Sequence, residues 1–110
     1  MEIRNEIIEG TTVLAPVGRI DSNSARAVEE VLLPLFNPGA SVLVDFSELT
    51  YISSAGLRVL LLAARRSKAT GVPLALAGMN KAVDEVFRIS GFAKLFKIHA
   101  DRATALAADA

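Results

Sequence analysis

Short apolar runs alternate with segments of helical period along most of this chain, and this alternation constrains the fold more than any other feature. The run Val42-Leu43-Val44 is rich in β-branched residues and apolar on both faces, which predicts a central strand. Apolar residues recur at helical spacing at about residues 24–36 before it and 57–68 after it. Strands that alternate with helices pair in parallel through right-handed crossovers. The sequence therefore predicts an α/β fold from residue 24 onward.

The two ends of the chain complete the predicted sheet. Extended segments at about residues 2–8 and 12–19 flank Glu9-Gly10-Thr11 and predict an antiparallel hairpin. Pro16 indicates an edge position or a bulge in the second segment, because proline lacks the N–H donor of a central strand. The remaining expected elements are a strand at 72–77, a helix at 81–90 that Asn80 caps and Gly91 ends, an extended piece at 92–98, and a short terminal helix capped by Asp101. We expect one domain over residues 1–110, a small mixed sheet of about four to five strands with about four helices packed against it.

Two hydroxyls and a glycine occur where a loop from about residue 47 ends and the long helix begins. This junction reads Ser53-Ser54-Ala55-Gly56, and the helix after it is apolar nearly all round, so we expect it to be largely buried. Free N–H groups at a helix N-terminus favour negative charge. The junction therefore predicts a place for a phosphate, either on a ligand or on one of the serines. Arg58, one turn beyond Ser54, can pair with such a phosphate, whereas the alternative without function is an ordinary N-cap at Ser54.

The composition excludes several classes of site. The chain has no cysteine and one histidine, His99, which excludes disulfides, thiolate chemistry and metal sites built from cysteines or several histidines. Its 12 basic and 12 acidic residues give a formal net charge of zero, so no bulk attraction to nucleic acid or anionic membrane is expected. No apolar run reaches the roughly 18–20 residues of a membrane span. We expect a soluble, cytoplasmic protein with no cofactor, no metal, no direct nucleic-acid contact and no membrane insertion.

The residues do not predict an enzyme. Ser53-Ser54-Ala55-Gly56 lacks the Gly-x-Ser-x-Gly pattern of a nucleophile elbow and the glycines and Lys-Ser/Thr of a P-loop. His99 is expected on the surface at a strand end, and the acidic pairs Glu29-Glu30 and Asp84-Glu85 are expected on solvated helix faces. A hydrolase that uses Ser54 and a weak nucleotide site remain open as the less favoured alternatives.

The chain resembles a known family in three places. The stretch from Val42 through Ser47 and then Leu49 to Leu57 is similar to the signature of STAS-domain anti-sigma factor antagonists, the anti-anti-sigma factors of bacterial partner-switching systems. Gly18-Arg19-Ile20-Asp21 resembles the family's first polar loop, and the segment from Ile89 to Phe96 resembles its C-terminal part. The resemblance covers almost the whole chain and implies a single STAS domain over residues 1–110, in agreement with the predicted order of elements.

The resemblance also implies a mechanism. In the family an anti-sigma factor with serine kinase activity phosphorylates the residue that corresponds to Ser54, and a metal-dependent serine phosphatase reverses the modification. The unphosphorylated antagonist binds the anti-sigma factor and frees the sigma factor. Asp45 is expected to hold backbone amides of the loop that follows it. The partner-binding face implied by the resemblance contains Asp21, Ser22, Asn23, Ser53, Ser54, Ala55, Gly56 and Arg58.

One departure from the family pattern affects this interpretation. Many members carry aspartate immediately before the acceptor, and this chain has Ser53 there. The change removes a negative charge and makes Ser53 a minor candidate acceptor. Some STAS domains are not phosphorylated, so the alternative function is that of a non-phosphorylated STAS interaction subunit of a transport or signalling complex.

Overall fold

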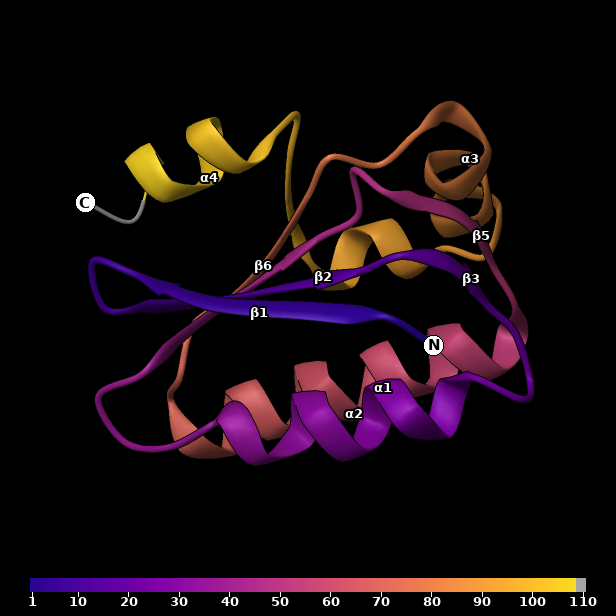
Figure 1. Ribbon diagram of the computed structural model, residues 1–110. Helices are drawn as coiled ribbons and strands as arrows, with labels where there is room; N and C mark the ends of the chain where they lie inside the picture. The colour runs from indigo at the N-terminus through magenta and orange to yellow at the C-terminus, as the bar shows by residue number, and fades with distance from the viewer. Residues whose placement is uncertain (109–110) are drawn as a thin grey trace.

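A five-stranded mixed sheet with helices on both faces forms the body of the protein, and a two-stranded sheet extends it at one end (Figure 1). The computed structural model describes residues 1–108. Its elements, in chain order, are β1 (Ile3–Ile8), β2 (Thr11–Pro16), β3 (Gly18–Ile20), α1 (Ala25–Leu32), the 3-10 helix η1 (Leu33–Leu35), β4 (Ser41–Asp45), β5 (Leu49–Ile52), α2 (Ser54–Thr70), β6 (Leu74–Ala77), α3 (Lys81–Ile89), the 3-10 helix η2 (Phe92–Leu95), β7 (Lys97–His99) and α4 (Arg102–Ala108).

The large sheet has the strand order β1-β2-β4-β6-β7. Strand β1 pairs antiparallel with β2, and the pairs β2–β4, β4–β6 and β6–β7 are parallel. Glu9 and Gly10 both have positive φ, 50° and 85°, as the tight turn of a hairpin requires. The predicted mixed α/β architecture is confirmed, and β4 is the central strand that Val42-Leu43-Val44 predicts.

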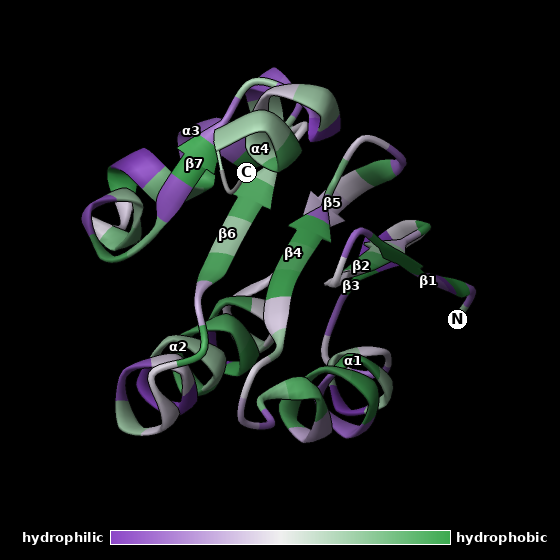
Figure 2. Ribbon diagram, turned by 90° about the vertical axis from the view of Figure 1, so that its left-hand side faces the viewer, coloured by the Kyte–Doolittle hydropathy of each residue, from purple (hydrophilic) through white to green (hydrophobic). Residues whose placement is uncertain are grey.

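Successive side chains of the central strands enter two different cores. Val42 and Val44 face the core under α1 and α2, whereas Leu43 packs with Ala105 of α4 on the opposite face. Figure 2 shows α1 and α2 below the strands and α4 above them. Both faces of β4 are therefore covered, which explains why it reads as a continuous apolar run.

The small sheet corrects two predictions. Strand β5, which pairs in parallel with β3, replaces the loop expected from about residue 47 to the junction. The strand expected at 12–19 is broken at Val17, so that β3 becomes a separate strand. Strand β2 is not an edge strand either, since it lies between β1 and β4. Pro16 fits there because the pairing with β4 ends at Leu14.

The helix boundaries follow local sequence signals with a few differences. Helix α1 ends at Leu32 and continues as η1 around Pro34. Gly71, with φ 74°, ends α2, and the Asn80 side chain accepts a hydrogen bond from Val83 N at 2.8 Å to cap α3. Asp101 caps α4 in the same way through Thr104 N, also at 2.8 Å. The extended piece expected from residue 92 begins instead as η2 and becomes extended only at β7.

Candidate functional site

The N-terminus of α2 separates the roles of the two adjacent serines. Ser53 is extended (φ −90°, ψ 174°) and is the N-cap, with its hydroxyl accepting from Gly56 N at 3.3 Å. Ser54 is the first helical residue and is exposed. Among residues 1–108, no hydrogen bond involves the Ser54 hydroxyl. The junction therefore does contain an ordinary N-cap serine, which is Ser53, because the helix begins at Ser54, one residue earlier than expected.

Gly56 brings the first turn of α2 against the small sheet. An added Cβ at this position would lie 2.7 Å from Cγ2 of Ile20 and 2.7 Å from Cγ1 of Ile52. Both isoleucines are buried, at 1% and 2% exposure. Position 56 therefore requires glycine, because α2 approaches the two strands closely there. As a buried residue, Gly56 acts on the site only by allowing this close packing.

The β3–α1 loop lies directly beside the start of α2. The backbone N–H of Ser53 donates to Ile20 O at 2.8 Å, so Asp21, the next residue of the loop, is adjacent to the serines. Asp21 Oδ1 accepts from the N–H groups of Asn23 and Ser24, both at 3.0 Å, and from the Ser24 hydroxyl at 3.1 Å. These bonds close the loop on itself, and Ser24 occupies the N-cap position of α1 without a side-chain cap bond.

These hydrogen bonds favour the ionised form of Asp21. Its pKa lies below the ordinary value, chiefly because the Ser24 backbone N–H donates to the carboxylate. Partial burial opposes this shift, while the Asn23 N–H, the Ser24 hydroxyl and the positive charge of Arg19 add to it. Ser22 and Asn23 remain exposed at the tip of the loop. The loop therefore presents its polar side chains from a backbone that Asp21 holds in place.

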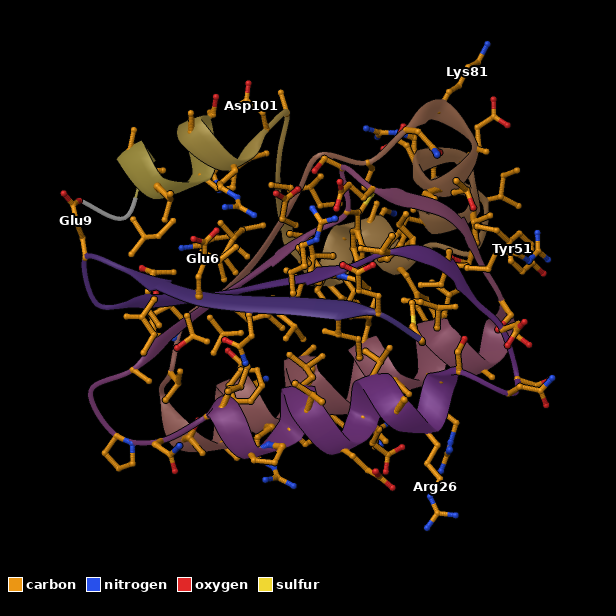
Figure 3. The ribbon with its side chains drawn as sticks, in the orientation of Figure 1. Glu6, Glu9, Arg26, Tyr51, Lys81 and Asp101 are labelled. Carbon is orange, nitrogen blue, oxygen red and sulfur yellow. The ribbon has the colours of Figure 1, made fainter. Side chains whose placement is uncertain are left out.

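Arg19 and Tyr51 form a feature of this face that the sequence did not predict. The two residues are opposite each other in the β3–β5 pair, and the Arg19 guanidinium lies 4.3 Å from the centroid of the Tyr51 ring. Tyr51 is 39% exposed and projects outward from β5 in Figure 3. An exposed aromatic ring that is stacked under a cation suits a protein-binding surface. The only available signal was the aromatic residue two positions before Ser53.

A hollow of about 340 Å³ separates the N-terminal halves of α1 and α2 beside the serines. Arg58, which is exposed, lines it from α2 one turn beyond Ser54, and Ser22 lines it from the loop. Arg26 and Glu29 line it from α1, and the Arg26 side chain points away from the body of the protein in Figure 3. The structure thus brings the predicted loop and helix residues to one end of the molecule, with Ser54 exposed between them.

Asp45 has the structural role expected of it and one further partner. Its Oδ1 accepts from Ser47 N at 3.0 Å, which confirms that it holds the loop after β4. Its Oδ2 accepts from Arg102 Nε at 2.9 Å, and Arg102 also pairs with Glu6. This ion pair ties α4 to the sheet, and nothing in the local sequence indicates it.

Of the other candidate groups, only Glu29 lines this face, at the hollow between α1 and α2. His99 is half-buried in β7, and Glu30 and Asp84 form helical ion pairs with Arg26 and Arg88. In the described part of the chain, no three His, Asp or Glu residues are grouped as a metal site would require. Within the same residues, no helix combines the length and the apolar character that crossing a membrane requires.

Comparison with known proteins places this geometry in a family. The family model described as the STAS domain matches residues 2–105. The protein BtrV of Bordetella bronchiseptica, assigned as an anti-sigma factor antagonist, is 36% identical over 109 residues, which cover 98% of this chain and 94% of BtrV.

Solved structures share the fold at lower identity. An anti-sigma factor antagonist from Mycobacterium paratuberculosis superposes with a TM-score of 0.87 at 22% identity, covering 97% of this chain and 92% of the other. The Bacillus cell fate determinant SpoIIAA in its phosphorylated form superposes with a TM-score of 0.75 at 19% identity, covering 99% of this chain and 100% of SpoIIAA. The chain therefore belongs to the STAS domain family, among the anti-sigma factor antagonists.

Proposed function

We propose that this protein is a phosphorylation-controlled anti-sigma factor antagonist whose switch is Ser54. In its unphosphorylated form it binds an anti-sigma factor with serine kinase activity, and it is released when that kinase modifies Ser54. A metal-dependent serine phosphatase restores the binding form. The protein is thus a cytoplasmic substrate of other enzymes and carries no catalytic residues of its own.

The observation that carries this proposal is the different state of the two serine hydroxyls. The Ser53 hydroxyl is occupied by Gly56 N, whereas the Ser54 hydroxyl is exposed and points from the first residue of a helix. A kinase needs a hydroxyl that can enter its active site without loss of local structure. Ser54 meets this condition, and modification of Ser53 would remove the cap of α2.

The start of α2 is suited to hold a phosphate without unfolding. Its first turn contains no acidic residue, so the positive end of the helix dipole is not yet compensated there. A phosphoserine adds a charge of about −1.5 to −2, which this end of the helix and the exposed Arg58 partly offset. We therefore expect the modified domain to stay folded.

Release then follows from electrostatics at the binding face. Ser54 lies between the Asp21 loop and the hollow that Arg58 lines, with Tyr51 and Arg19 beside it. A phosphate at this place introduces bulk and charge into a surface that has to be desolvated when a partner binds. An unpaired charge buried in an interface costs several kcal/mol, roughly 2–5. Binding is switched off while the fold is unchanged.

The geometry also gives a reason for serine at position 53. An N-cap requires a short side chain with an oxygen acceptor, and both serine and aspartate provide one. Ser53 therefore keeps the capping role of the aspartate found in many relatives and omits its charge.

Calorimetry with the cognate anti-sigma factor tests the proposal. Ser54→Ala is expected to keep the wild-type affinity, whereas Ser54→Asp is expected to weaken binding by at least about 30-fold, the equivalent of roughly 2 kcal/mol. Ser53→Asp is the matched control, because it adds the same charge one residue away. At position 53 the side-chain oxygen accepts a hydrogen bond from Gly56 N and caps the helix. Equal affinities of Ser54→Asp and Ser54→Ala would refute the switch. Recovery of membrane-transport subunits and no anti-sigma factor from the native host would instead favour a non-phosphorylated interaction subunit.

A further inference from the structure

The end of α2 opposite Ser54 has a groove that the proposed function does not use. Two hollows, of about 530 and 540 Å³, open there. They share Ser67, Lys68, Lys94 and Leu95 as walls and are therefore parts of one groove between α2 and η2. The groove follows the C-terminal half of α2, so that about 10 Å of helix separates Ser54 from its near end at Leu61, and about 20 Å separates Ser54 from Lys68. Figure 2 looks onto this end of α2, where the ribbon is mostly hydrophilic.

The charged side chains that line the groove are all cations. Among residues 1–108, no carboxylate lines either hollow. Four basic side chains surround the groove: Arg65, Lys68, Lys94 and Lys97. None of them forms an ion pair within residues 1–108, although Arg4, Arg26, Arg88 and Arg102 elsewhere do. Because the whole chain has a formal net charge of zero, this concentration is a local asymmetry. It creates a positive potential that favours an acidic partner.

The floor of the groove is apolar, with several aliphatic residues and Phe96. Leu61 and Ala64 of α2 lie outside the core and, with Arg65 and Lys68, form a stripe at positions i, i+3, i+4 and i+7. Leu95 faces the groove from η2 and is 53% exposed. Helix α2 is thus buried on one side only, whereas its sequence predicts that it is largely buried. Its apolar residues outside the core, Leu61 and Ala64, line this groove.

The groove lacks the features of a phosphate site. Three donors at the end of α2 are already engaged: Gly71 N donates to Ser67 O at 2.9 Å, Val72 N to Thr70 Oγ1 at 3.3 Å, and the Ser67 hydroxyl to Val72 O at 2.5 Å. It also lies at the C-terminal end of α2, where the helix dipole is negative. Flexible lysines around an apolar floor instead fit carboxylates that flank an apolar side chain.

We propose that this groove is a second protein-binding site, which receives an acidic segment of a partner protein with an aliphatic or aromatic anchor. The anchor lies on Leu61, Ala64 and Leu95, and the carboxylates pair with the four cations. Since the site is at the far end of α2, it is open whether or not Ser54 carries a phosphate. The protein is then able to hold one partner at this groove while it exchanges another at the N-terminal site.

A synthetic acidic amphipathic peptide, with leucines at helical spacing and glutamates on both sides of them, serves as the probe. Titration into the ¹⁵N-labelled full-length protein is expected to shift amide signals of Lys68, Gly71 and Leu95 and to leave those of Ser22 and Ser54 in place. Fluorescence polarisation with the labelled peptide gives the affinity, which is expected to weaken as salt is added. Absence of shifts in the groove, or equal binding of a peptide with glutamine in place of glutamate, would overturn the proposal.

Charge reversal provides the matched comparison. Lys68→Glu/Lys94→Glu is expected to weaken binding by about tenfold or more, because two favourable ion pairs become repulsive. Arg66→Glu/Lys81→Glu has the same change of net charge at exposed positions outside both hollows, and is expected to change affinity by less than about twofold. An equal loss in both variants would mean that only bulk charge matters and would refute the site.

Two further variants test the apolar floor of the groove and its independence of Ser54. Leu95→Ser, at a half-exposed position that is expected to tolerate it, should weaken binding without any change of charge. Ser54→Asp should bind the peptide like the wild type, so that failure of the phosphorylation switch and failure of the groove are distinguishable. If the groove instead mediates dimerisation that Lys94→Glu abolishes, or binds anionic phospholipid vesicles and no peptide, the proposed occupant is wrong.

Discussion

Replacing Gly56 by alanine tests how closely α2 approaches the small sheet. The new methyl group would lie 2.7 Å from atoms of both Ile20 and Ile52 and 3.2 Å from Cδ1 of Ile52. The two nearest atoms are attached to the β-carbons of buried, β-branched side chains, which have little rotamer freedom to move away. Overpacking of this kind costs about 1–3 kcal/mol.

A second effect acts in the opposite direction. Alanine favours a helix over glycine by about 0.5–1 kcal/mol, and by less within the first turn. The steric cost is the larger of the two, so we expect a net loss of about 1–2 kcal/mol in the free energy of unfolding. For a domain of this size the melting temperature falls by roughly 4–8 °C.

Urea unfolding followed by circular dichroism measures this loss. Ile20→Ala alone removes core packing and is expected to cost about 2–5 kcal/mol. In the double variant with Gly56→Ala, the new methyl group occupies part of the space that Ile20 leaves. The combined loss should therefore be smaller than the sum of the single losses by more than about 0.5 kcal/mol. A Gly56→Ala protein that is as stable as the wild type, or strictly additive losses, would refute the close approach.

Three more predictions concern the site and its surroundings. Ser53→Ala should lower the free energy of unfolding by about 0.5–1 kcal/mol through loss of the cap, whereas Ser54→Ala should leave this free energy nearly unchanged. Thermal melts of both variants test this, and equal losses would contradict the assignment of the cap to Ser53. Arg102→Met should lower the free energy of unfolding by about 1–3 kcal/mol, because it leaves the carboxylate of Asp45, which is 4% exposed, without its cation. Chemical denaturation measures this loss, and the double variant with Asp45→Asn should recover part of it. The pKa of Asp21 should be lower than that of an ordinary aspartate in a ¹³C NMR titration and should rise in Ser24→Ala, and an ordinary pKa would show that the loop is open. Because folding lowers this pKa, the contribution of Asp21 to stability is present at neutral pH and is lost as the pH falls through the lowered pKa.

Local signals account for the elements that the sequence predicts correctly. The run Val42-Leu43-Val44 has no polar face, so it fits only a strand covered on both sides. Gly71, Asn80 and Asp101 each meet a demand of the backbone within a few residues of their own position. These predictions needed no knowledge of distant partners.

The elements that were missed depend on distant residues. Strand β5 has four residues and is a strand only because β3 lies beside it. The capping role of Ser53 rather than Ser54 is fixed by where Gly56 meets Ile20 and Ile52, and two adjacent serines give no local signal to distinguish them. The Arg102–Asp45 pair joins residues 57 positions apart. The cationic groove likewise forms only when the ends of α2 and η2 come together.

The most direct test of the proposed switch is to map the phosphorylation site. The wild type, Ser53→Ala and Ser54→Ala proteins are incubated with the kinase-active cognate anti-sigma factor and ATP, and the modified residue is identified by mass spectrometry. We predict a single phosphate on Ser54 in the wild type and in Ser53→Ala, and none in Ser54→Ala. Undiminished modification of Ser54→Ala, or a phosphate at a residue outside the start of α2, would contradict the switch.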